Sequence, residues 1–229
     1  MLNDIAKSFD QLFTGKFWSV TLKSILLTLP LLGVAIWLGF TLVDTIPATR
    51  YDWLNSVIDF VGSLGAIVLS LILFPALAQM VMGLFLDDIA AAVEQKHYAR
   101  DPAGNPVGMG TAVGQGVKLG VLIIVVNLVL LPLYLIFLFF PLLSLALYYL
   151  VNGWLLNREY FELVATRHGD AKQHKAWRRG NGGRLFLAGC AIAFVFTIPV
   201  VNLVAPAWAT AFMTHVFKRV EGESHAVVP

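Results

Sequence analysis

Cations gather at two places in this sequence where they could bind an anion. Near the N-terminus, Lys23 follows Lys16 and precedes Ser24. A cation beside the free N–H groups of a helix N-terminus offers an anion both charge and hydrogen-bond donors. In the stretch 178–184, a glycine-rich turn can point successive N–H groups toward one anion between its flanking arginines. This second group forms a basic patch of Arg178, Arg179 and Arg184.

Each group also has an ordinary explanation, and the sequence leaves both open. The arginines could contact anionic lipid headgroups, and Lys23 could extend from a membrane edge to the headgroups. No enzyme motif accompanies them. The single Cys190 has no second thiol or histidine at zinc-ligand spacing. His168 and His174 lie in a charged segment without ligand partners, so we expect no catalytic residue, no cofactor and no metal.

The composition indicates the environment of these residues. Hydrophobic residues make up 58% of the chain and charged residues 13%, against roughly 45–50% and about 25% in soluble proteins. The apolar residues are gathered in long runs without a charge. We therefore predict an all-α integral membrane protein, with residues 1–229 forming a single membrane domain.

The first half of the chain predicts three helices. Residues 3–13 carry one apolar stripe that includes Ile5 and Phe9, which is typical of an amphipathic helix at a membrane surface. The run 19–43 is long enough for a transmembrane helix. The run 57–97 predicts a second, long transmembrane helix that continues into the cytoplasm, because its last part keeps a helical composition after the charges at Asp87 and Asp88.

The second half predicts two helical hairpins that are broken by proline. Residues 119–151 contain 33 residues without a charge, which is about 50 Å as a straight helix and exceeds a hydrocarbon core of roughly 30 Å. Pro132 and Pro141 should break this run, with the apex at 139–141. A hairpin over 119–156 and a second over 185–216 then flank a basic cytoplasmic segment, 157–184. Proline positions leave open whether the hairpins cross the membrane or stop midway.

The charges predict the orientation, because Lys and Arg near membrane ends gather on the cytoplasmic side. With both runs folded as hairpins, fifteen of the sixteen cations share one side and only Arg50 lies opposite. We therefore expect a multi-pass protein whose two termini are both cytoplasmic.

The two predicted hairpins share a short pattern, in which an asparagine precedes a proline. Asn127 precedes Pro132, and Asn202 precedes Pro206. An internal repeat of broken helices is one way to build a transport path, and these four residues are our candidates for a pore or a hairpin tip. Chance similarity in leucine-rich sequence and a plain hydrogen bond between helices are the alternatives.

The stretch Ile198-Pro199-Val200-Val201-Asn202-Leu203-Val204-Ala205-Pro206 resembles the C-terminal part of proteins of the CysZ family, which are bacterial sulfate permeases. A second stretch, Asn152-Gly153-Trp154 through Arg158-Glu159-Tyr160-Phe161-Glu162, resembles the membrane-exit helix of that family. The resemblance implies a homo-oligomer of the inner membrane, with partly penetrating hairpins, that supplies sulfate for cysteine biosynthesis. One departure concerns the Gly-Leu-Arg type motif at the sulfate site of the family. Here that region is Ser19–Ser24, and Lys23 cannot reproduce the bidentate contact of an arginine.

Our leading hypothesis is a permease or channel for sulfate or a related oxyanion, in which Lys16, Lys23 and Ser24 are the anion-binding candidates. Membrane lipids and further copies of the chain are the other expected partners, and nucleic acid is not expected. The alternative is a non-transporting membrane scaffold or envelope-organising protein. An enzyme of lipid metabolism is disfavoured because no carboxylate or histidine constellation accompanies the membrane segments.

Overall fold

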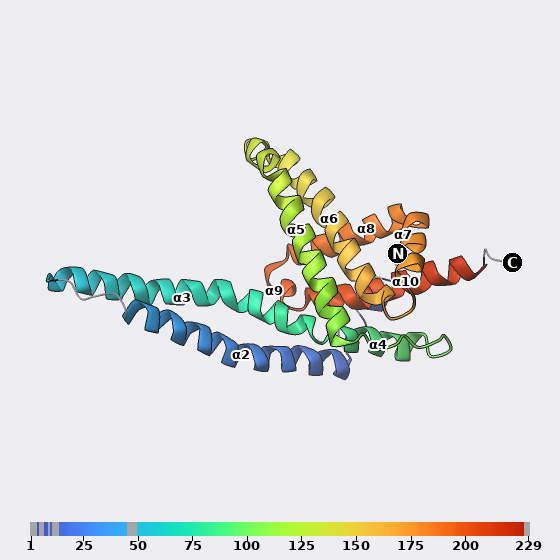
Figure 1. Ribbon diagram of the computed structural model, residues 1–229, viewed down its shortest axis with the longest axis horizontal. Coiled ribbons are helices and arrows are strands. Elements are labelled where there is room, and N and C mark those ends of the chain that lie inside the picture. Colours follow the sequence, from blue (N-terminus) through green and yellow to red (C-terminus); the bar gives the residue numbers. More distant parts are fainter. Residues whose placement is uncertain (1–3, 5–6, 9, 11–13, 45–49, 227–229) are drawn as a thin grey trace. The chain divides into compact units, whose positions relative to one another are not determined.

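The computed structural model describes residues 4, 7–8, 10, 14–44 and 50–226, and these residues form helices joined by short turns and one longer loop, without a strand (Figure 1). Two compact units divide the chain. One is Trp18–Phe85, and the other combines Met1–Phe17 with Leu86–Pro229. The expected single membrane domain over residues 1–229 stays a prediction, and each unit is described by itself.

The helix α2 (Gly15–Asp44) includes the predicted transmembrane helix 19–43 and begins earlier. Its stretch Phe17–Thr41 is long and apolar enough to cross a membrane, and little of it is buried within the chain. Pro30 lies inside the helix without ending it. The Thr28 hydroxyl donates to the Ser24 carbonyl oxygen at 2.6 Å, so this polar group is satisfied within the helix.

The predicted continuous helix 57–97 is divided into two helices in the structure. α3 (Asp52–Gly83) ends at a turn over Leu84 and Phe85, and α4 (Leu86–His97) follows. Glycine is a poor helix former, so Gly83 favours a break at this point. Asp87 and Asp88 then stand in the first turn of α4, where carboxylates stabilise the start of a new helix.

The first predicted hairpin is present, with α5 (Met109–Phe137) packed beside α6 (Pro141–Ala165) (Figure 1). The turn Leu138–Phe140 matches the predicted apex, and Pro141 opens α6 at a position where its missing N–H is no loss. Leu147, Val151 and Leu155 of α6 form the packed core between the two helices.

Our prediction that Pro132 breaks the run was wrong, because Pro132 lies inside a continuous α5. A proline removes one backbone hydrogen bond, and an apolar helix of 29 residues keeps the others. The stretch Gly110–Phe137 is therefore long enough to cross a membrane, and its most apolar window has no residue buried within the chain. The two arms of this hairpin have 29 and 25 residues.

The second predicted hairpin corresponds to α8 (Gly182–Phe196), the single turn α9 (Pro199–Asn202) and α10 (Ala205–Ala226). Pro199 and Pro206 lie at the starts of α9 and α10, so here the prolines do separate helices. α8 packs closely along α6. α10 is buried along most of its length, with Trp208, Phe212 and Phe217 among the least exposed side chains. This pair of helices therefore forms much of the core of its unit.

The predicted basic segment 157–184 contains the end of α6, a turn and the helix α7 (Ala171–Gly180). A capping box starts α7, since the Asp170 carboxylate accepts from the Gln173 backbone N–H at 2.9 Å while the Gln173 side chain accepts from the Asp170 N–H at 3.1 Å. Because this capping fixes the first turn, α7 has a defined direction beside the end of α6.

A buried ion cluster joins the turn after α6 to α4, and we call it the Arg167 cluster. The Arg167 guanidinium contacts Glu94 at 3.2 Å and also pairs with Asp87. His168 meets the other oxygen of Glu94 at 2.8 Å. Burial alone would raise the pKa of Glu94, but the hydrogen bonds and charges of His168 and Arg167 lower it to about 2. A side chain at Gly104 would collide with Arg167, so the loop packs tightly against this cluster.

Most of the predicted interfacial helix 3–13 lies outside the described residues. Of the four that are described, Asp4 is buried and pairs with Arg219 of α10 at 2.6 Å. Asp10 pairs with Lys96 of α4 at 3.0 Å. The location of this segment at a membrane surface stays a prediction.

Candidate functional site: a basic pocket

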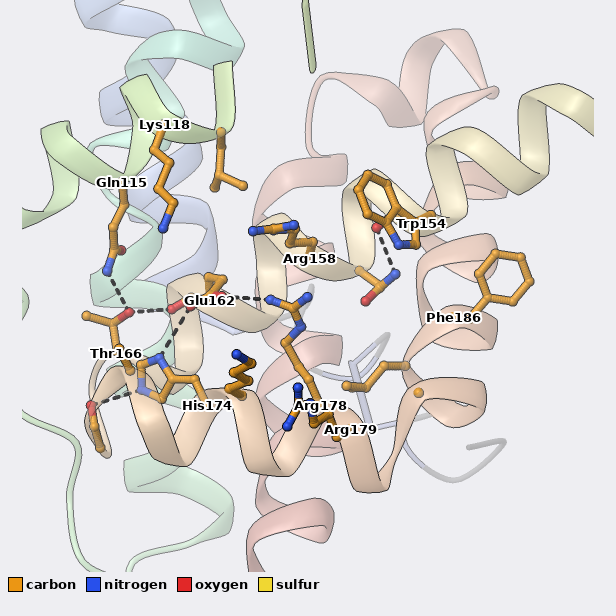
Figure 2. A pocket seen from close by; sticks show the side chains of 17 residues that line it. Gln115, Lys118, Trp154, Arg158, Glu162, Thr166, His174, Arg178, Arg179 and Phe186 are labelled. Atoms are coloured by element: carbon orange, nitrogen blue, oxygen red, sulfur yellow. Dashed lines mark hydrogen bonds and ion pairs between the residues drawn. The ribbon is translucent and has the colours of Figure 1, made fainter. Parts of the chain in front are cut away.

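An open pocket of about 680 Å³ lies where the first turns of α5, the end of α6, α7 and the start of α8 meet, and we call it the basic pocket (Figure 2). This volume lies within the range of roughly 300–1,000 Å³ that small-molecule sites occupy. All of its residues belong to one unit of the chain. They are Gln115, Lys118, Leu119, Trp154, Asn157, Arg158, Glu162, Thr166, Gly169, Ala171, His174, Lys175, Arg178, Arg179, Gly182, Leu185 and Phe186.

Helical spacing explains how these side chains reach one place. The residues of α6 and its C-cap follow each other at intervals of four along one face; they are Trp154, Arg158, Glu162 and the C-cap Thr166. An interval of four likewise puts His174 and Arg178 of α7 on the side that faces α6. The Gln115 amide of α5 donates to the Thr166 hydroxyl at 2.9 Å, so α5 joins this wall through a side-chain hydrogen bond.

Glu162 is the single carboxylate in the pocket wall, and two α7 side chains hold it (Figure 2). Arg178 donates to one oxygen at 2.9 Å, and the His174 Nδ1 lies 3.3 Å from the other. The hydrogen bond from His174 is the largest influence on this carboxyl, and with the charge of Arg178 it lowers the pKa of Glu162 against the opposing effect of burial. Glu162 is therefore ionised and ties α7 to α6.

His174 has an acceptor at each ring nitrogen. Its Nε2 lies 2.9 Å from the Gly169 carbonyl oxygen, while Nδ1 faces Glu162. Only the protonated ring can donate to both acceptors. Burial by itself lowers the pKa of His174, but the hydrogen bond and charge of Glu162 outweigh it and raise the pKa above its usual value. Protonation of His174 adds to the positive charge of the pocket.

Five cations and one carboxylate line the pocket, so its net charge is strongly positive. Arg178 is paired with Glu162. Arg158 lies over the ring of Trp154, with its guanidinium carbon 5.9 Å from the ring centroid, and Figure 2 shows Arg158 and Lys118 extending toward the same space. The other four cations form no ion pair with any residue that the structure describes, and they are Lys118, Arg158, Lys175 and Arg179.

The structure separates the predicted anion-binding residues. Arg178 and Arg179 line the basic pocket, whereas Arg184 stands in the first turn of α8 and is not part of the pocket wall. Lys23 is exposed on α2, in the other unit. The Ser24 hydroxyl is buried and donates to the Val20 carbonyl oxygen at 2.9 Å, so its proton is already used within the helix.

Lys16 lies in the first turn of α2, and its side chain is outside the described set. The structure therefore leaves the roles of Lys16, Lys23 and Ser24 in anion binding as predictions.

Of the four residues proposed for a pore or a hairpin tip, the two in the first hairpin lie away from its turn. Asn127 and Pro132 lie within α5, before the turn Leu138–Phe140, so neither is at a tip. The Asn127 amide donates to the Ile123 carbonyl oxygen at 2.8 Å and its oxygen accepts from Tyr134 at 3.3 Å.

Asn202 ends α9, and Pro206 is the second residue of α10. Both therefore lie at the connection between α8 and α10. A role for any of these four residues in a pore stays a prediction.

Sequence reasoning missed several residues of the pocket, although one signal was present. Residues 119–157 carry no charge, and Lys118 and Arg158 are the charged residues that bound this run. When a hairpin folds at 139–141, both ends of the run come to the same level. The predicted hairpin alone could therefore have brought Lys118 and Arg158 together. The pairing of Glu162 with α7 carried no comparable signal.

Over the residues that the structure describes, these observations define an all-helical protein with two helices long enough to cross a membrane and a basic pocket beside one of them. No group of three or more His, Cys, Asp or Glu side chains in the described part of the chain could hold a metal ion. The family described as sulfate transporter CysZ/etoposide-induced protein 2.4 matches residues 4–206. The chain belongs to this family, which confirms the resemblance seen in the sequence. Together with the apolar helices, the family match favours a membrane protein that is similar to sulfate transporters. A search of curated proteins found no significant match.

Proposed function

We propose that this protein is a permease for sulfate or a related oxyanion in the bacterial inner membrane and that it supplies sulfur for cysteine biosynthesis. The observation that carries the proposal is the family match over residues 4–206, since the family description includes a sulfate transporter. The exposed apolar surfaces of α2 and α5 support insertion in a membrane. Both termini are cytoplasmic in this proposal, and the protein acts as a homo-oligomer.

The basic pocket supports a preference for anions. Its unpaired cations create a positive potential at the end of the uncharged part of α5. Such a potential raises the local concentration of anions and speeds their arrival. In this proposal the pocket collects oxyanions at the cytoplasmic face, and Lys23 offers a further cation on α2.

A growth experiment tests the cellular role. Bacteria that lack sulfate uptake should grow on sulfate as the sole sulfur source when they express this chain, and they should grow on cysteine with or without it. Rescue on sulfate together with accumulation of labelled sulfate would support the proposal. Membrane-located protein that gives no rescue would instead favour the scaffold hypothesis.

A further inference from the structure

The walls of the basic pocket change from charged to apolar residues, and a free inorganic anion needs only the charged ones. Along one face of α6, residues at intervals of four run from apolar through aromatic to charged; they are Leu150, Trp154, Arg158 and Glu162. Leu150 and Trp154 are exposed, by 57% and 41%. The same order runs in the opposite chain direction on α5, from Gln115 through Lys118 to Leu119. Both helices of the hairpin therefore change from polar to apolar at the pocket.

The wall that α8 contributes to the pocket is also apolar. Leu185 and Phe186 line the pocket; Leu185 is buried, Phe186 is half-buried, and the next residue, Leu187, is 56% exposed. Apolar side chains thus stand on the α8 side of the pocket, while the α7 cations Lys175 and Arg179 stand on another side. An inorganic anion would use the cations and leave the apolar wall in water.

We propose that the basic pocket binds the phosphate group of an anionic phospholipid, whose acyl chains follow the exposed apolar side chains beside Trp154 and Leu187. Arginine forms bidentate hydrogen bonds with phosphate, and Arg158 and Arg179 are the unpaired arginines that line the pocket. Tryptophan is enriched at the level of lipid headgroups, which is the level that Trp154 occupies between the apolar and the charged residues of α6. The pocket volume of about 680 Å³ accommodates a headgroup, whereas a tetrahedral oxyanion would fill only a small part of it.

This inference does not depend on the proposed transport activity. A single headgroup phosphate carries one negative charge, and four of the pocket's cations form no ion pair with a described residue. The pocket would therefore remain positive with a lipid bound and could still attract oxyanions. The bound lipid would bridge α6 and α7, because Arg158 belongs to one helix and Arg179 to the other.

Native mass spectrometry of the full-length protein in detergent tests the proposal, with phosphatidylglycerol as the probe and phosphatidylcholine as the neutral comparison. We expect one tightly retained phosphatidylglycerol per chain and much weaker retention of phosphatidylcholine. The double variant Arg158→Gln with Arg179→Gln should lower the apparent affinity for phosphatidylglycerol about 25-fold, since each cation near an anionic lipid surface contributes about fivefold.

The matched control is Lys172→Gln with Arg100→Gln, which removes two exposed cations outside the pocket wall and should leave lipid retention unchanged. Circular dichroism verifies that both double variants remain helical. If the pocket variant loses its helices, the single substitution Lys118→Gln takes its place and should lower the apparent affinity about fivefold.

Three results would overturn the proposal. The first is equal retention of the two lipids, and the second is equal loss in the pocket variant and the control. The third is displacement of the lipid by millimolar inorganic phosphate or sulfate, which would identify the pocket as a site for free oxyanions. Sulfate uptake by the same preparations reports separately on transport, so failure of one proposal leaves the other open to test.

Discussion

The close crossing of α6 and α8 predicts that a side chain added at Gly189 destabilises the protein, and the distances in the structure indicate by how much. A Cβ atom at Gly189 would overlap the carbonyl oxygen of Gly153 and lie 2.8 Å from the Cβ of Asn157. Carbon atoms in contact are about 3.5–4.0 Å apart, so Gly189→Ala requires the two helices to separate by about 1 Å. The obstacles are backbone and Cβ atoms, which cannot turn aside as the end of a flexible side chain would.

Overpacking of this kind costs roughly 1–3 kcal/mol. We expect Gly189→Ala to destabilise the protein by about 2 kcal/mol, which corresponds to a fall of about 4–8 °C in the unfolding midpoint of a chain of this size. Gly183→Ala is the matched control, because Gly183 is an exposed residue of the same helix and a Cβ there meets nothing within 4 Å. The control should be neutral or slightly stabilising, since alanine favours helix over glycine.

Thermal unfolding of the two variants in detergent, followed by circular dichroism, makes the comparison. A Gly189→Ala protein as stable as Gly183→Ala would refute the close approach of α6 to α8. The basic pocket would also lose its basis, because α6 and α8 supply two of its walls.

Three further predictions concern charged residues. Arg167→Met should destabilise the protein by about 3–5 kcal/mol, because Glu94 then stays buried without its guanidinium partner; adding Glu94→Gln should recover part of this loss in the same unfolding assay. His174 has a raised pKa, so its stabilising effect is present below its ordinary pKa of 6.5 and is lost as the pH rises through the higher folded value. The difference in unfolding midpoint between the natural chain and His174→Gln should therefore be larger at pH 6 than at pH 9, and an equal difference would count against the contact with Glu162. Lys23→Ala should reduce labelled sulfate uptake several-fold while Lys172→Ala does not, and unchanged uptake would remove Lys23 from the site.

Much of the helical plan could be predicted from the sequence, because long uncharged runs and turn residues are local signals. The run 119–151 had to fold back, and Pro141 placed the turn. Pro132 misled the prediction, since a proline inside an apolar helix costs one hydrogen bond and does not force a break. The break after Gly83 was missed because the composition of 89–97 continues to favour helix.

The site was predicted only in part, because its residues come from four helices. Arg178 and Arg179 stood out as a local cluster, and both line the pocket. Glu162 and His174 become a pair only when α7 folds back on α6, and no spacing in the sequence indicates that contact. The burial of α10 was equally hidden, because an apolar helix in a protein core and one in a membrane have similar compositions.

The most direct test of the central claim is the uptake of radiolabelled sulfate by liposomes that contain the purified protein, with empty liposomes as the blank and chloride and phosphate as competitors. We expect sulfate uptake clearly above the blank, and excess chloride should not abolish it. Folded protein in the liposomes without uptake above the blank would contradict the account and make the non-transporting scaffold the leading hypothesis.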